Sequence, residues 1–524
     1  MSEIMNKKII DGRSTSGRLQ GKNYDLSLAV KCINGTFVGK KAENVITYKG
    51  IPFVGKQPVG DLRWKAPVDV TPDDGIYEAY NFAKLSCQDL SITDYQGEDC
   101  LYLNVFKAEG DYQSPQSTKK PVMVWIHGGA FVAGGTGIPL FDCSELVKEN
   151  PDVIFVTVPY RLGVLGFLHL SHLPDGKDYP DAQNLGLLDQ KMALKWVHEN
   201  IAAFGGDPDN VTIWGESAGA GSVTMQPLIK GSQQYFQKVI AQSGAPIQTN
   251  SVEESISTTN DLMEALDCKT VADLMKVDAR TLIDTAAATV ALRIFPVRDE
   301  RILPLDPWEA YVNGIAKDIV FLQGCNKDEM NCFVADWTVE GFKAWAADRK
   351  TKKYAHLLTD EERAKIESFC KEGAVEDWEP DSRLFGHSWF IEGAIKMSES
   401  QTKGGGKSYT YYYRVESSDP IRKSAHFEEV PIVFAHPEMI EGRQYDAIFM
   451  KTMRKLWVQF AKTGNPSLSA DISPDGKAKE WPLYDLDNKQ VMVLDEFDIH
   501  PAKESEVKIV DWDKTYFLTK YYML

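Results

Sequence analysis

Continuous apolar runs, separated by helical patterns, organise most of the chain. Such runs are typical of strands buried on both faces of a mostly parallel sheet, and they occur at 122–126, 153–158, 211–214, 239–240 with its flanks, and 319–322. The clearest helical pattern between them spans 187–197, where apolar residues recur at helical spacing. Strands that alternate with helices predict an α/β fold.

The remaining segments predict additions to this central sheet. Between residues 30 and 64, β-prone segments alternate with turn signals such as Asn34-Gly35, which predicts a small antiparallel sheet near the N-terminus. Two helix-prone stretches, approximately 253–289 and 338–403, are interpreted as helical, cap-like insertions over the sheet. The sequence shows no linker rich in Pro or Gly and no repeat, so we expect one catalytic domain over residues 1–524.

Charge and hydropathy exclude several classes of function. The 524 residues carry a formal net charge of −17, and this negative field opposes binding to nucleic acid or to an anionic membrane surface. No window approaches the roughly 20 apolar residues of a membrane span, and the first residues, Met-Ser-Glu-Ile-Met-Asn-Lys-Lys, lack the apolar centre of a signal peptide. We therefore expect a cytoplasmic protein.

The eight cysteines form no Cys-x-x-Cys pair, so they do not resemble a zinc site. In a chain without an export signal, most are expected to be free thiols that behave as small apolar residues.

The candidate nucleophile is Ser217. It lies in Gly215-Glu216-Ser217-Ala218-Gly219, directly after the apolar run 211–214 and before a helix-compatible run through Leu228. Gly-x-Ser-x-Gly between a strand and a helix is the nucleophile elbow, a sharp turn that presents the serine hydroxyl. The two glycines allow neighbouring backbone to pass close to this turn.

A candidate oxyanion hole follows the run 122–126. The loop begins His127-Gly128-Gly129-Ala130, and paired glycines after a strand allow backbone N–H groups to approach a tetrahedral intermediate. The N–H of Ala218 would complete the hole.

A nucleophilic serine also needs a base and an acid. In α/β hydrolases both follow the serine in the chain. Of the five histidines after Ser217, we favour His426, because it lies in a loop between a Tyr-rich strand ending near Val415 and the apolar run 430–434; the others are His356, His387, His436 and His500. The acid is expected after the run 319–322, where Asp328 and Glu329 are both candidates. Neighbours on an extended loop point in opposite directions, so only one of them faces His426.

Together these stretches resemble the type-B carboxylesterases, the family of α/β hydrolases that includes the cholinesterases. The resemblance covers nearly the whole chain and rests on the elbow, the Gly-Gly loop and further segments; these are Tyr48-Lys49-Gly50-Ile51-Pro52, Glu98-Asp99-Cys100-Leu101-Tyr102-Leu103-Asn104-Val105, Tyr160-Arg161-Leu162-Gly163, Phe204-Gly205-Gly206-Asp207-Pro208 and Phe460-Ala461-Lys462-Thr463-Gly464-Asn465-Pro466. It implies an α/β-hydrolase fold and serine esterase activity.

The resemblance also implies residue roles. Ser217 is the expected nucleophile, Glu329 rather than Asp328 the acid, and His426 the base. The oxyanion donors correspond to Gly128, Gly129 and Ala218. Ser243 and Glu216 occupy positions expected to support the triad.

A further implication of the resemblance is a disulfide between Cys87 and Cys100. The loop that it would close holds no tryptophan to stack on choline, so a choline ester is not the expected substrate. Four apolar residues are candidates for lining the acyl side of the pocket, namely Phe131, Leu292, Ile294 and Phe295.

The expected reaction is hydrolysis of small carboxylic esters, with short- to medium-chain acyl groups, through an acyl-enzyme. It requires no metal and no organic cofactor. Two alternatives stay open: a lipase that acts on longer chains, and a catalytically silent binding protein on the same scaffold. The partner is expected to be a small-molecule ester, and the sequence leaves the oligomeric state open.

Overall fold

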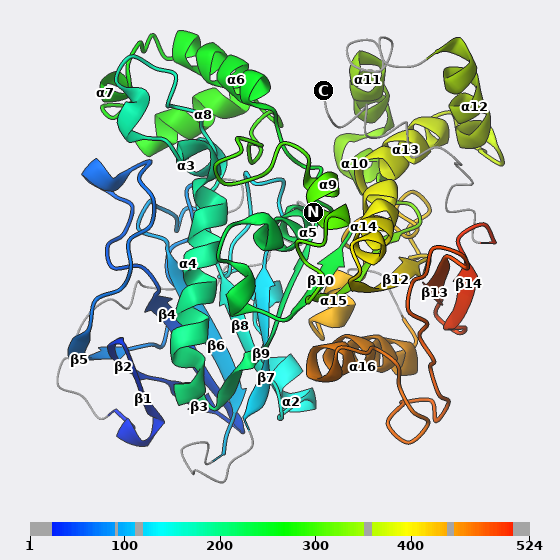
Figure 1. Cartoon of the computed structure of the whole chain (residues 1–524), viewed down its shortest axis with the longest axis horizontal. Coiled ribbons are helices and arrows are strands. Elements are labelled where there is room, and N and C mark those ends of the chain that lie inside the picture. Colours follow the sequence, from blue (N-terminus) through cyan, green and yellow to red (C-terminus); the bar gives the residue numbers. More distant parts are fainter. Residues whose placement is uncertain (1–23, 90–92, 111–118, 350–358, 437–444, 507–524) are drawn as a thin grey trace. The chain divides into compact units, whose positions relative to one another are not determined.

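The computed structural model describes residues 24–89, 93–110, 119–349, 359–436 and 445–506 (Figure 1). Contacts within the chain group it into two compact units. The first unit comprises Met5–Val239 and Thr249–Asp306, and the second comprises Ile240–Gln248 and Pro307–Leu524. The expectation of a single domain over residues 1–524 stays a prediction.

Buried strands form the centre of the first unit. In order across the sheet they are β9 (Gly206–Glu216), β7 (Lys120–Ile126), β8 (Ile154–Val158), β6 (Tyr102–Ala108), β4 (Val45–Pro52) and β3 (Lys40–Ala42). The strand β7 pairs in parallel with both β8 and β9, whereas β6 runs antiparallel to β8. The apolar runs at 122–126, 153–158 and 211–214 all lie in these strands, because a strand covered on both faces buries every side chain.

Helices cover this sheet and extend beyond it. The longest, α4 (Leu185–Asn200), lies along the sheet in Figure 1, as the periodicity at 187–197 predicts. The predicted insertion at 253–289 is largely helical, and its three helices lie together in Figure 1. The remaining α-helices of the unit are α2 (Ser144–Glu149), α3 (Gly163–Gly166), α5 (Ala218–Met225), α6 (Val252–Ala265), α7 (Val271–Leu274) and α8 (Ala279–Thr289).

The small N-terminal sheet has three strands. The antiparallel hairpin β1 (Ala29–Cys32) and β2 (Asn34–Val38) is joined in parallel by β5 (Asp73–Glu78). Gly35 has φ 133°, a conformation that favours glycine. The strands β3 and β4, within the segment where we expected the small sheet, belong to the large sheet instead.

The second unit contains strands in the order β10 (Lys238–Gln242, which begins in the first unit), β11 (Val320–Asn326), β12 (Lys407–Tyr413), β13 (Gln490–Leu494) and β14 (His500–Lys503). The pairs β11–β12 and β12–β13 are parallel, and β14 is antiparallel to β13. The run at 239–240 lies within β10, and the run at 319–322 overlaps the start of β11. The fold is therefore α/β with a large, mostly parallel sheet.

Most of the helices of the second unit follow β11 or β12. Residues 350–358 of the predicted insertion 338–403 lie outside the described part, and the described part of that insertion is largely helical. The α-helices are α9 (Pro307–Val312), α10 (Asn331–Trp337), α11 (Val339–Arg349), α12 (Asp360–Lys371), α13 (Glu379–Gly386), α14 (Glu392–Lys403), α15 (Val430–Val433) and α16 (Ala447–Thr463), and one π-helical turn spans His387–Ile391.

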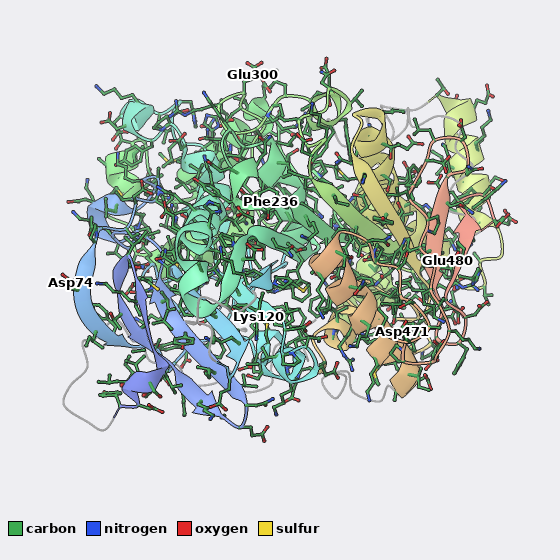
Figure 2. The ribbon with its side chains drawn as sticks, turned by 60° about the horizontal axis from the view of Figure 1, so that its bottom comes forward. Asp74, Lys120, Phe236, Glu300, Asp471 and Glu480 are labelled. Carbon is green, nitrogen blue, oxygen red and sulfur yellow. The ribbon has the colours of Figure 1, made fainter. Side chains whose placement is uncertain are left out.

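Buried apolar side chains form the core of the described residues, and Figure 2 labels one of them, Phe236, together with charged residues of the surface. Phe236 is buried, while the labelled carboxylates Asp74, Glu300, Asp471 and Glu480 are exposed. This segregation follows from the free energy gained when apolar surface leaves water.

Candidate active site

Ser217 lies in a strained turn between β9 and α5. Its backbone has φ 56° and ψ −124°, a conformation that costs a non-glycine residue about 1–3 kcal/mol. A Cβ on Gly215 would lie 2.6 Å from the carbonyl oxygen of Gly219, and a Cβ on Gly219 would lie 2.1 Å from the Ile126 oxygen. Both glycines are therefore required for the close packing of this turn against β7.

The Gly-Gly loop lies directly against the elbow. A Cβ on Gly128 would lie 2.7 Å from the carbonyl oxygen of Glu216 and 3.1 Å from Cβ of Ser217. Gly129 has φ 108°, and a side chain there would meet the Ala133 carbonyl oxygen at 2.1 Å. The first unit thus brings Gly128 next to the serine that begins α5.

His127 holds this loop, a role that sequence reasoning missed. Its Nδ1 donates to the Gly128 oxygen at 2.8 Å, and the Tyr160 hydroxyl donates to the His127 oxygen at 2.9 Å. The two rings stack with centroids 4.5 Å apart. Burial lowers the pKa of His127 to about 4, so the imidazole is neutral at physiological pH. The sequence signal that could have revealed this role is the position of His127 immediately before two glycines.

The second unit pairs Glu329 with His426. Nδ1 of His426 lies 2.6 Å from Oε2 of Glu329, and the His426 N–H donates to the Glu329 carbonyl oxygen at 3.0 Å. Both side chains are buried. A carboxylate that accepts from Nδ1–H fixes the tautomer in which Nε2 carries no proton.

Two further donors hold the carboxylate of Glu329. The Ser243 hydroxyl donates to its Oε1 at 2.6 Å, and the backbone N–H of Asn326 donates to the same oxygen at 2.7 Å. The neighbouring Asp328 instead accepts from the N–H of Ser424 at 3.3 Å, and burial raises the pKa of this carboxyl group. Of the two candidate acids, the structure places Glu329 against His426.

A strained serine at a strand-to-helix turn, and a buried carboxylate–histidine pair, are the parts of a serine hydrolase. Residues 26–508 match the model of the carboxylesterase family. The chain belongs to the carboxylesterase family.

Relatives of known structure or activity agree. The chain is 33% identical over 503 residues to para-nitrobenzyl esterase of Bacillus subtilis, covering 90% of this chain and 96% of the relative. It is 29% identical to acetylcholinesterase of Bungarus fasciatus over 502 residues, covering 86% and 79%. A crystal structure of a Geobacillus stearothermophilus carboxylesterase superposes with a TM-score of 0.80 at 31% identity, covering 92% and 99% of the two chains.

Family membership and these relatives identify the chain as a carboxylesterase with the α/β-hydrolase fold, which acts on small-molecule esters. Among the described residues, none of the helices has the length and apolar character that crossing a membrane requires.

A second buried carboxylate, Glu429, accompanies the acid–histidine pair in this carboxylesterase. It accepts hydrogen bonds from Nε2 of Gln242 at 3.0 Å and from Nδ2 of Asn326 at 2.6 Å. The indole N–H of Trp457 donates to the Gln242 side chain at 3.0 Å. Asn326 therefore binds Glu329 through its backbone and Glu429 through its side chain. Sequence analysis missed this network, because its members lie up to 215 positions apart.

The other predicted residues lie as follows. Glu216 is buried, and a Cβ on Gly128 would lie 3.0 Å from its Oε2. Phe131 is buried and makes an edge contact with Phe295, with ring centroids 6.1 Å apart. Ile294 is buried and Leu292 half-buried with φ 56°. Among the weaker histidine candidates, His356 lies outside the described residues.

The two cysteines of the implied disulfide are described as free thiols in the structure. Cys87 and Cys100 are both buried, and the Ser86 hydroxyl lies 3.4 Å from Sγ of Cys100. Burial raises the pKa of Cys87 to about 11 and that of Cys100 further, so both are protonated thiols at neutral pH. The pairing came from the family resemblance alone, and it stays a prediction.

Proposed function

We propose that this carboxylesterase cleaves esters of small, short- to medium-chain carboxylic acids through an acyl-enzyme. Ser217 is the nucleophile, His426 the general base and Glu329 the acid that orients the imidazole. The oxyanion is bound by the backbone N–H groups of Gly128, Gly129 and Ala218.

In the first half-reaction the hydroxyl oxygen of Ser217 attacks the ester carbonyl carbon, and Nε2 of His426 takes the hydroxyl proton. The tetrahedral intermediate collapses as His426 returns this proton to the departing alcohol. Water then attacks the acyl-enzyme with the same base, which releases the acid and restores the serine. Glu329 keeps Nδ1 protonated and stabilises the transient imidazolium.

The observation that carries the proposal is the strained backbone of Ser217, with φ 56° and ψ −124°, in a chain of the carboxylesterase family. Strain of this size persists only where the surrounding structure imposes it, and it is characteristic of catalytic turns. The hydrogen bond of 2.6 Å between His426 and Glu329 supports the assignment of base and acid.

The test is hydrolysis of p-nitrophenyl esters from acetate to palmitate, with Ser217→Ala measured alongside. We expect the highest kcat/KM with short and medium chains, and a loss of at least about 10³-fold in kcat for Ser217→Ala. Ser232→Ala is the matched control, because Ser232 is also buried and its hydroxyl bonds only to Gln226 among the contacts described; it should keep wild-type kcat.

Other outcomes would favour the alternatives. A rate that rises up to palmitate would indicate a lipase. A wild type that cleaves none of the esters, and is not labelled at Ser217 by a fluorophosphonate, would favour a silent binding protein. The cytoplasmic location also stays a prediction.

A further inference from the structure

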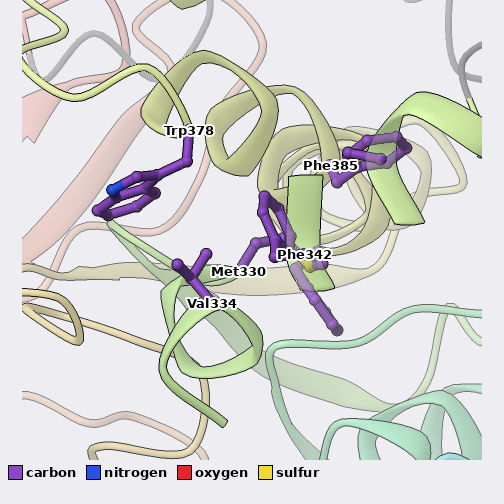
Figure 3. Close-up of a cluster of buried hydrophobic side chains, with 7 residues drawn as sticks. Met330, Val334, Phe342, Trp378 and Phe385 are labelled. Carbon is purple, nitrogen blue, oxygen red and sulfur yellow. The ribbon is translucent and has the colours of Figure 1, made fainter. Parts of the chain in front are cut away.

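One helical turn in the insertion of the second unit is a π-helical turn, which is wider than an α-helical turn. A π-helical turn, His387–Ile391, joins α13 to α14. In a continuous α-helix, residues five apart point roughly 140° away from each other. Phe385 and Phe390 are five apart, yet both belong to one buried cluster with Met330. Figure 3 labels Phe385 and Met330 of this cluster. The π turn therefore lets both phenyl rings enter the same cluster, and such turns occur frequently at functional sites.

The segment from Gly386 to Phe390 contacts the acid–histidine pair. The ring centroid of Phe390 lies 4.2 Å from that of His426, with 31° between the ring planes, and Phe390 is only 2% exposed. At the start of the turn, a Cβ on Gly386 would lie 3.5 Å from Cβ of Glu329. One short segment thus packs against both members of the pair.

Neighbouring residues fix the segment in place. Ile391, next to Phe390, packs in a second buried cluster with Cys325 of β11 and Tyr412 of β12. The side chain of Phe390 consequently lies in the cluster around Met330, while the next residue anchors the backbone on the sheet. A buried aromatic ring anchored on both sides has little freedom to leave its rotamer.

We propose that Phe390 is a positioning residue of the esterase reaction, carried by the π turn onto the imidazole of His426 so that the ring keeps Nδ1 on Glu329. The inference rests on the proposed role of His426 as the base. It assigns a function to a residue that belongs neither to the triad nor to the oxyanion hole.

Two physical effects support this role. The hydrogen bond at Nδ1 fixes one atom of the imidazole, and a phenyl ring packed on the imidazole restricts rotation about that bond. The face of an aromatic ring also attracts positive charge within about 6 Å, so the contact stabilises the imidazolium that forms when His426 takes the serine proton. Both effects act on the transition state more than on substrate binding.

The experiment compares Phe390→Leu and Phe390→Met with Phe385→Leu. Phe385 is the matched control, because it is a buried phenylalanine of the same cluster that packs on Trp345, with centroids 4.7 Å apart. We expect both Phe390 variants to lose roughly tenfold in kcat at unchanged KM, the effect of about 1.4 kcal/mol in the barrier, and Phe385→Leu to keep kcat within twofold. Phe390→Met keeps most of the volume, so the comparison survives if the leucine variant folds poorly.

A second measurement needs no substrate. The downfield proton resonance of His426 Nδ1–H, assigned by its loss in His426→Gln, should shift or broaden in the Phe390 variants and stay in place in Phe385→Leu. Equal kcat losses in the Phe390 and Phe385 variants, or a change in KM alone, would overturn the inference. If Ser217→Ala retains activity, the proposed function fails; if Ser217→Ala is inactive and Phe390 behaves as Phe385, only the present inference fails.

Discussion

At the scale of single residues, Glu329 shows how several hydrogen-bond donors hold one buried carboxyl group in place. Three donors converge on it, from Ser243, Asn326 and His426. Ser243 itself has φ 54°, so the backbone is strained where its hydroxyl meets the acid. A buried polar group without hydrogen-bond partners is costly, and these donors satisfy the side chain of Glu329.

The first prediction concerns this hydroxyl. Ser243→Ala removes one donor to Oε1 of Glu329, and a hydrogen bond to a charged group contributes about 1.5–3 kcal/mol. We expect kcat to fall by roughly tenfold or more with KM nearly unchanged, since the orientation of His426 matters most in the transition state. Steady-state kinetics on p-nitrophenyl butyrate measure the effect. Wild-type kcat in Ser243→Ala would show that Asn326 and His426 suffice to hold the acid.

At the scale of elements, the turn between β9 and α5 depends on close backbone packing against β7. Both flanking glycines lie where any side chain would meet backbone atoms. Backbone cannot move aside as a flexible side chain can, so the geometry of Ser217 depends on these two positions.

The second prediction is a comparison of two Gly→Ala changes. In Gly219→Ala the new Cβ would lie 2.1 Å from the Ile126 oxygen, whereas in Gly341→Ala, within α11, its nearest neighbour is the Thr338 hydroxyl at 3.4 Å. We expect Gly219→Ala to lower both activity and melting temperature. Gly341→Ala should keep activity and raise stability by about 0.5–1 kcal/mol, as for alanine in a helix. Thermal melts and ester hydrolysis test both changes. Normal activity in Gly219→Ala would mean that the turn tolerates a side chain.

One element, a π-helical turn, could not be predicted from the hydrophobic periodicity of the sequence. The stretch 338–403 reads as helical, and its described part is largely so. The π turn His387–Ile391 has no hydrophobic pattern in the sequence that predicts it. It depends on the tertiary packing of Phe385 and Phe390 in one cluster.

At the scale of the whole molecule, the division into units does not follow a linker. The boundary between Val239 and Ile240 falls inside the strand β10 (Lys238–Gln242), and the chain changes unit again after Gln248 and after Asp306. Independent domains are normally joined by exposed linkers with few crossings. Because residues of both units lie in β10, we expect the two units to unfold together.

The third prediction follows from this connectivity. We expect a single thermal transition, in which tryptophan fluorescence, far-ultraviolet circular dichroism and residual esterase activity change together at one heating rate. Two separated transitions, with activity lost in the first, would show that the units fold independently.

The sequence alone determined the strands and the elbow of this protein. Buried parallel strands need continuous apolar residues, so the strands at 122–126 and 211–214 can be predicted from the sequence without knowledge of the fold. The elbow is also local, because its strain and its glycines lie within five consecutive residues. Family resemblance added the roles of Glu329 and His426.

Only the tertiary structure decided what surrounds those residues. Glu329 and His426 are 97 positions apart, and the residues alone left Asp328 and Glu329 equivalent until the loop conformation turned one toward the histidine. The contacts of Phe390 and Glu429 likewise depend on packing between distant elements. Local sequence specifies conformations that short segments can impose by themselves, whereas contacts between distant segments follow from how the whole core packs.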